Sequence, residues 1–141
     1  GERIAIEVLT QSLHSPMDPV LRLVNAAGET LQQADDSSVG PDGRFSHQFA
    51  EEGDYWIEIR DSRNAAGGAA YQLRIGDFPI VNQCFPLAIR AGESTQVSFS
   101  GPDGKSIAPR ALTFEPGTQN RIVVPVSFGQ GQSSSQSSVW V

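Results

Sequence analysis

An apolar residue at every second position is the feature that most constrains the fold of this chain. Ile4, Ile6 and Val8 alternate with Ala5 and Glu7. Successive side chains of a β-strand point to opposite faces of the sheet, so this period predicts strands with one buried face. Several further segments repeat the pattern, and no convincing stretch has the spacing of a helix. We therefore expect an all-β protein.

Nine segments of this kind define the expected strands, six before residue 77 and three after it. They cover residues 4–8, 21–23, 30–34, 45–49, 55–59, 71–75, 96–99, 111–114 and 121–128, and residues 139–141 are expected to begin a further strand. Short strands separated by turn-rich loops are typical of jelly-roll or immunoglobulin-like β-sandwiches. Pro125 predicts that the last strand lies at an edge or contains a bulge, because proline has no N–H to donate.

A change in charge and a proline-containing connector predict two tandem small sandwiches, at residues 1–77 and 78–141. The first half has six arginines and thirteen acidic residues, a net charge of −7, whereas the second half has a net charge of +1. Residues 76–86 contain two prolines, which stiffen a connector. Residues 129–138 are rich in serine, glutamine and glycine, and this composition predicts disorder or a long loop.

Composition also argues against several classes of partner. The formal net charge is −6, and an acidic surface repels the phosphates of nucleic acids. No apolar run approaches the roughly 20 residues of a membrane span, so we expect no membrane insertion. Cys84 is the single cysteine; it cannot form an internal disulfide, and its apolar neighbours predict a buried thiol.

The first half resembles the bacterial pre-peptidase C-terminal (PPC) domain, in the form found in large exported planctomycete proteins. The segments that carry the resemblance are residues 1–8, 15–23, 35–36, 53–61 and 71–79. The resemblance covers about residues 1–77. It implies a jelly-roll-like sandwich in an extracytoplasmic protein, where such domains assist localisation or substrate binding. The second half is similar to a small immunoglobulin-like domain in its strand pattern.

One strand of the family pattern is missing from this sequence. Family members carry an Asp-x-Tyr/Phe-x-Phe strand ahead of the segment that matches Gly1 to Arg3. Its absence predicts an open sheet edge at which another chain can pair by strand addition. A homodimer formed by such edge pairing is one expected consequence.

Four acidic residues, Asp18, Asp35, Asp36 and Asp42, are the candidate ligands for a calcium ion. Related PPC-like modules of collagenases bind calcium, which takes about six to eight oxygen ligands from loops. The loop is not an EF-hand, because Ser46 stands where the final glutamate would be. The alternative is an ordinary acidic turn, in which these carboxylates accept backbone N–H groups.

Trp56, Glu58 and Arg60 are the candidate ligand-binding residues. Alternation places them on the face opposite Tyr55 and Ile57. An exposed aromatic ring flanked by polar groups suits a polysaccharide or a protein surface. The alternative places Trp56 in packing, under a loop or against the partner sheet.

A Ser-His-Asp hydrolase is the third possibility. Ser12, His14, Ser15 and Asp18 lie close together in the sequence, and His47 is a second base. Catalysis requires these groups to meet in one cleft, and neither a nucleophile elbow nor a metalloprotease motif occurs.

We therefore expect no enzyme, but a non-catalytic accessory, spacer or adhesion module that works beside other domains of an exported protein. Binding of carbohydrate or protein through the Trp56 face is the first alternative, and a cryptic hydrolase the second.

Overall fold

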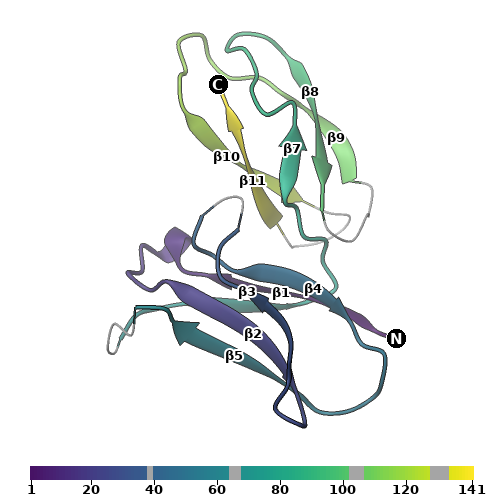
Figure 1. Ribbon diagram of the computed structural model, residues 1–141. Coiled ribbons are helices and arrows are strands. Elements are labelled where there is room, and N and C mark those ends of the chain that lie inside the picture. The colour runs from purple at the N-terminus through teal and green to yellow at the C-terminus, as the bar shows by residue number, and fades with distance from the viewer. Residues whose placement is uncertain (38–39, 64–67, 102–106, 128–133) are drawn as a thin grey trace. The chain divides into compact units, whose positions relative to one another are not determined.

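The chain consists of β-strands that form two compact units. The computed structural model describes residues 1–37, 40–63, 68–101, 107–127 and 134–141. The first unit is Gly1–Phe78 and the second is Pro79–Val141 (Figure 1). The division lies one residue from the boundary expected at residue 77. Every pair of described strands is antiparallel, so the predicted all-β class is confirmed.

The strands described in the first unit form two three-stranded sheets. The first sheet has the order β4-β1-β6, and the second has the order β3-β2-β5. Their bounds are β1 Arg3–Leu9, β2 Pro19–Asn25, β3 Thr30–Ala34, β4 Arg44–Gln48, β5 Tyr55–Asp61 and β6 Gln72–Gly76. A short 3-10 helix, η1 (Gln11–Leu13), lies between β1 and β2. These six strands correspond to the six expected in this half.

The core of the first unit is formed by one face of each sheet, as in a sandwich. The buried cluster consists of Ile6 and Val8 from β1, Leu21 and Leu23 from β2, and Phe45 from β4. Residues of β5 and β6 pack against this cluster and are only partly buried. The period of two in the sequence therefore indicates correctly which side chains enter the core.

A buried ion-pair network lies on the other face of β1. Glu7 is opposite Arg44 of β4 on one side and opposite Arg74 of β6 on the other. Its carboxylate lies 3.6 Å from Arg44 Nη1 and 2.7 Å from Arg74 Nη1. Burial raises the pKa of Glu7, and the two arginines oppose that shift. The Glu7 carboxylate therefore depends on both cations to remain ionised in this position.

The described residues of the second unit form a smaller sandwich of five strands. One sheet has the order β7-β8-β9, and the other pairs β10 with β11. The strands are β7 Gln83–Phe85, β8 Thr95–Ser100, β9 Ile107–Leu112, β10 Arg121–Ser127 and β11 Ser134–Trp140. Its core includes Val97, Val126, Val139 and Cys84. Cys84 is buried, as expected. Its Sγ donates a hydrogen bond of 3.1 Å to the Ser138 carbonyl oxygen.

Two expectations about the second half were wrong. Residues 134–138, expected in a loop or disordered segment, belong to strand β11, and residues 129–133 lie outside the described residues. Pairing with β10 satisfies the backbone of this serine-rich segment, and Val139 anchors it in the core. The segment 76–86, expected to be only a connector, contains β7. Pro125 lies in β10, which pairs with β11 alone among the described strands, as expected for an edge strand.

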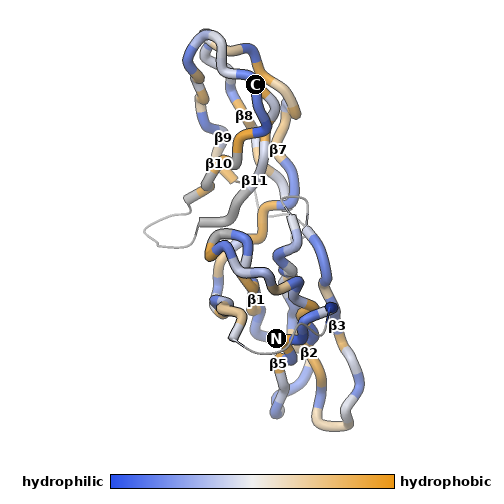
Figure 2. The backbone as a smooth tube through the Cα atoms, turned by 90° about the vertical axis from the view of Figure 1, so that its left-hand side faces the viewer, coloured by the Kyte–Doolittle hydropathy of each residue, from blue (hydrophilic) through white to orange (hydrophobic). Residues whose placement is uncertain are grey.

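Polar and apolar residues interchange along both units (Figure 2). This distribution follows from thin sandwiches, in which most strands contribute one side to the core and the other to the exterior, whereas β1 is buried on both faces. In the part of the chain that the structure describes, no helix is long and apolar enough to span a membrane.

Candidate binding sites

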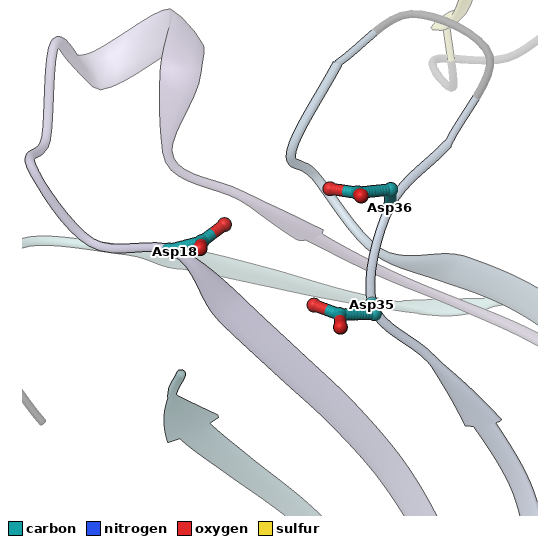
Figure 3. A group of neighbouring side chains, drawn as sticks. All are labelled: Asp18, Asp35 and Asp36. Atoms are coloured by element: carbon teal, nitrogen blue, oxygen red, sulfur yellow. The ribbon is translucent and has the colours of Figure 1, made fainter. Parts of the chain in front are cut away.

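Three of the four predicted calcium ligands lie together in the first unit. Asp18 immediately precedes β2, and Asp35 and Asp36 immediately follow β3. Because these strands are antiparallel, with Leu21 opposite Ala34, the start of β2 lies beside the end of β3. Carboxylate oxygens of the three residues lie within 4.8 Å of one another. Figure 3 shows the side chains of Asp35 and Asp36 directed towards Asp18.

The end of β5 supplies the surroundings of Asp18. Ser62 Oγ donates a hydrogen bond of 2.6 Å to Asp18 Oδ2, and Arg63 Nε lies 3.3 Å from the same oxygen. The backbone N–H of Asp18 donates to Asp61 Oδ1 at 3.3 Å. Asp18 is therefore held in place from two sides, by its own strand and by the turn that follows β5.

The three carboxylates form a cluster that a divalent cation can neutralise. Three negative groups within a few ångströms repel one another, and Asp35 and Asp36 are exposed while Asp18 is partly buried. Arg63 supplies one positive charge, and its side chain is 68% exposed. The oxygen donors are hard ligands of the type that calcium prefers. The arrangement thus has the right ligand chemistry, with one arginine competing for Asp18.

The fourth predicted ligand, Asp42, is not part of this group. It is buried, and its Oδ1 accepts hydrogen bonds from Thr10 N and Thr10 Oγ1, each at 2.7 Å, and from Gln11 N at 3.1 Å. This carboxylate therefore fixes the start of η1, which is the backbone-binding role of an acidic turn residue. Of the other oxygen donors considered in this loop, Ser38 lies outside the described residues.

Trp56 lies on the outer face of the β3-β2-β5 sheet and is 52% exposed. Its neighbours in β5, Tyr55 and Ile57, are turned to the opposite face and pack against the core cluster. Trp56 is thus not packed beneath a loop or a second sheet, which was the alternative interpretation. Across the ladder it is opposite Val24 of β2.

Charged side chains continue this face away from Trp56. Glu58 is opposite Arg22 of β2, and Glu58 Oε2 lies 2.8 Å from Arg22 Nη1 and 3.3 Å from Arg60 Nη2. Arg22 also donates to Thr30 Oγ1. We call the surface formed by Arg22, Trp56, Glu58 and Arg60 the Trp56 face. It combines an exposed aromatic ring with hydrogen-bond donors and acceptors on two neighbouring strands.

The two histidines occupy separate positions in the first unit. His14 is exposed at the end of η1 and has a left-handed backbone conformation, with a φ of 52°. His47 Nδ1 lies 3.3 Å from Gln32 Oε1, and its ring packs edge-on against Phe49. The described side-chain contacts of these histidines include neither a serine hydroxyl nor a carboxylate.

Sequence reasoning missed three residues at these sites. Arg22 belongs to the Trp56 face, and Ser62 and Arg63 contact Asp18. Arg22 alternates with apolar residues along its strand, so its outward position was readable, but its partner across the ladder depends on register. Ser62 and Arg63 lie 44 or more positions from Asp18 along the chain, and only strand pairing brings them there.

No protein-family model, no curated protein and no solved structure matches this chain.

Proposed function

We propose that this chain is a non-catalytic accessory module of an exported protein, and that the Trp56 face binds polysaccharide. The observation that carries the proposal is the exposure of Trp56, at 52%, on a regular strand. An indole ring offers a large apolar surface with little conformational entropy to lose on binding. The PPC-like sequence of the first half supports placing the module in an extracytoplasmic protein.

The charged part of the Trp56 face supports carbohydrate as the ligand class. Sugar rings present apolar C–H faces, which stack on aromatic rings, and hydroxyl groups, which both donate and accept hydrogen bonds. Glu58 offers carboxylate oxygens as acceptors, and Arg22 and Arg60 offer guanidinium donors. The ion pairs among these residues hold the groups in position before a ligand arrives, which reduces the ordering cost of binding.

Substitution of Trp56 tests this proposal directly. The chain has two tryptophans, so a Trp140→Phe background leaves Trp56 as the single indole fluorophore. We expect soluble polysaccharides from a glycan panel to shift its emission. Trp56→Ala in the native background is expected to weaken binding at least about tenfold, as for a central aromatic contact.

Trp140→Ala is the matched control, because Trp140 is 58% exposed on β11 of the second unit. It is expected to leave polysaccharide binding unchanged. Equal losses in the two variants would contradict the assignment of the Trp56 face. Binding of proteins but of no glycan in the panel would replace polysaccharide with a protein surface as the ligand.

Calcium binding by Asp18, Asp35 and Asp36 is a second proposed property of the first unit. The observation that favours it is the convergence of three carboxylates at the ends of β2 and β3. A bound cation would relieve their mutual repulsion and would link the two strand ends. Solvent and nearby oxygens such as Ser62 Oγ would complete the coordination that three side chains cannot provide alone.

Titration of metal-stripped protein with calcium chloride tests this second proposal. We expect heat in calorimetry and a rise in melting temperature, because an ion that binds only the folded state stabilises it. Asp35→Asn combined with Asp36→Asn should abolish both signals, whereas Asp54→Asn, an exposed acidic residue outside the group, should preserve them. Arg63→Gln should strengthen binding, since it removes the competing cation. No heat and no thermal shift in the unmodified protein would end the proposal.

A further inference from the structure

A cleft of about 850 Å³ with apolar and acidic lining residues opens at one end of the first unit. Its apolar lining comes from both sheets: Ile4 and Ile6 of β1, Leu23 of β2, Tyr55 and Ile57 of β5, and Ile75 of β6. Ile6 and Leu23 belong to the buried core cluster. The cleft therefore leads from the surface to the core between the two sheets.

Ile75 marks the place where the sandwich is incomplete. It is opposite Ile6 in the β1–β6 ladder and points to the same side of the sheet. Ile6 is 1% exposed, whereas Ile75 is 53% exposed. The difference follows from strand order, because β1 has a neighbour on each side and β6 is an edge strand among the described residues. A strand added beside β6 would cover Ile75 in the way that β6 helps to cover Ile6.

The edge strands of the two sheets are close together on one side of the sandwich and flank the cleft on the other side. On one side β3 and β4 lie close to each other. On the other side β5 and β6 are also edge strands, and they flank the cleft. An edge strand presents unpaired backbone N–H and C=O groups, which an extended peptide can satisfy while its alternate side chains enter an adjacent apolar cleft.

Four acidic side chains surround this cleft. Glu2, Glu51, Glu52 and Asp54 all line it and are all exposed. Within the described residues, none of these carboxylates has an ion-pair partner. The loop that carries Glu51 is fixed by a hydrogen bond of 3.0 Å from Tyr55 Oη to the Glu51 carbonyl oxygen. The rim therefore favours positively charged occupants and repels acidic ones.

We propose that the cleft binds an extended, basic peptide segment, which adds a strand to the free edge of β6. Its apolar side chains contact Ile75 and Ile57, and lysine or arginine residues at its end face the acidic rim. A second copy of this chain is a poorer occupant, because its first half carries a net charge of −7. This surface is formed by different residues from the Trp56 face, so substitutions can test the two proposals separately.

Synthetic peptides test the proposal. The probe is a fluorescein-labelled peptide of about eight residues that alternates valine and threonine and ends in two lysines. The comparison peptide ends in two glutamates and is otherwise identical. We expect the lysine peptide to raise fluorescence anisotropy in a salt-sensitive manner, and the glutamate peptide to bind at least about tenfold more weakly.

Two pairs of variants locate the binding site. Ile75→Lys is expected to weaken binding at least about tenfold, because it removes apolar contact and adds a like charge. Its control is Leu31→Lys, which changes another exposed apolar residue, 39% exposed, on β3. Glu51→Gln with Glu52→Gln should weaken binding of the lysine peptide and reduce its salt dependence. Glu115→Gln, an exposed acidic residue in the second unit, should change neither quantity.

Three outcomes would overturn this inference. The first is equal binding of the lysine and glutamate peptides, and the second is unchanged binding by Ile75→Lys. The third is a dimer in sedimentation equilibrium that Ile75→Lys dissociates, which would make a second copy the occupant of the edge. Trp56→Ala should leave peptide binding intact, so failure of the polysaccharide proposal and failure of this one are distinguishable.

Discussion

At the scale of single residues, the same side chain has different roles according to its surroundings. Asp42 is buried and its carboxylate is occupied by three donors from Thr10 and Gln11. Asp35 and Asp36 are exposed and lie near a third carboxylate. Sequence position alone does not separate these cases, since all three belong to one polar loop. The separation depends on which backbone N–H groups lie within reach of each carboxylate.

Glu7 is a charged residue with almost no exposure to solvent. It is 2% exposed and is paired with two arginines. Burial raises its pKa above the ordinary value of 4.5, so the folded state holds the proton more tightly than the unfolded state does. The contribution of Glu7 to stability is therefore greatest when it is protonated, and it declines as the pH rises from 4.5 through the raised pKa. Arg74 and Arg44 lower the pKa of Glu7 and so limit this loss of stability.

Arg44→Met should enlarge the loss of stability that accompanies ionisation of Glu7 as the pH rises. The substitution leaves Glu7 with one cation fewer in a buried position, and we expect a loss of about 3–5 kcal/mol in the free energy of unfolding near neutral pH. The loss should shrink as the pH falls below the Glu7 pKa, because the protonated carboxyl no longer needs the cation. Urea denaturation between about pH 4 and about pH 8 measures both effects.

Arg60→Met is the control for this prediction. The Arg60 side chain is 61% exposed and pairs with Glu58 at the surface, where an ion pair is worth about 1 kcal/mol or less. The decrease in the free energy of unfolding caused by Arg60→Met should be small and nearly independent of pH. If Arg44→Met were equally destabilising at both ends of the pH range, packing of the arginine stem rather than its charge would explain the effect.

At the scale of elements, strand register decides which residues can act together. The pairing of β2 with β3 brings Asp18 to Asp35 and Asp36, and the pairing of β2 with β5 brings Arg22 to Glu58. A shift of one residue in either ladder would move these side chains to the opposite face. The Trp56 face and the group of Asp18, Asp35 and Asp36 therefore both depend on β2, which is the central strand of its sheet.

The elements that sequence reasoning missed are those with the weakest apolar alternation. Strand β7 has three residues, Gln83–Phe85, with one buried side chain between two exposed ones. In strand β11 only the residues from Val139 onward were expected in a strand, because the residues before Val139 are serine and glutamine. Neither pattern differs from that of a loop when the chain is considered alone. Each becomes a strand because a neighbouring strand accepts and donates its backbone hydrogen bonds.

At the scale of the whole molecule, each unit has its own hydrophobic core. One cluster consists of first-unit residues such as Leu21, and the other of second-unit residues such as Val97. A chain with two separate cores is expected to unfold in two steps that can be perturbed separately.

Leu21→Ala should destabilise the first unit alone. Leu21 is fully buried, and we expect a loss of about 2–5 kcal/mol from lost burial and the resulting cavity. Hydrogen exchange followed by mass spectrometry should show faster exchange in residues 1–78 and unchanged exchange in residues 79–141. Val97→Ala should give the reciprocal pattern. Equal changes in both units after either substitution would mean that the chain unfolds as one cooperative body.

The sequence alone was enough to predict the strand class, the six strands described in the first unit and the inward-facing residues of that unit. These features are local, because alternation of apolar and polar side chains along a strand is enough to define its buried face. It also predicted that Trp56 faces away from the core, and its exposure agrees. The contacts between distant residues could not be predicted in this way: Asp18 meets Asp35, Arg22 meets Glu58, and Ile75 lies at an uncovered edge. Strand order and register fix those contacts, and both are set by packing between segments that are far apart in the chain.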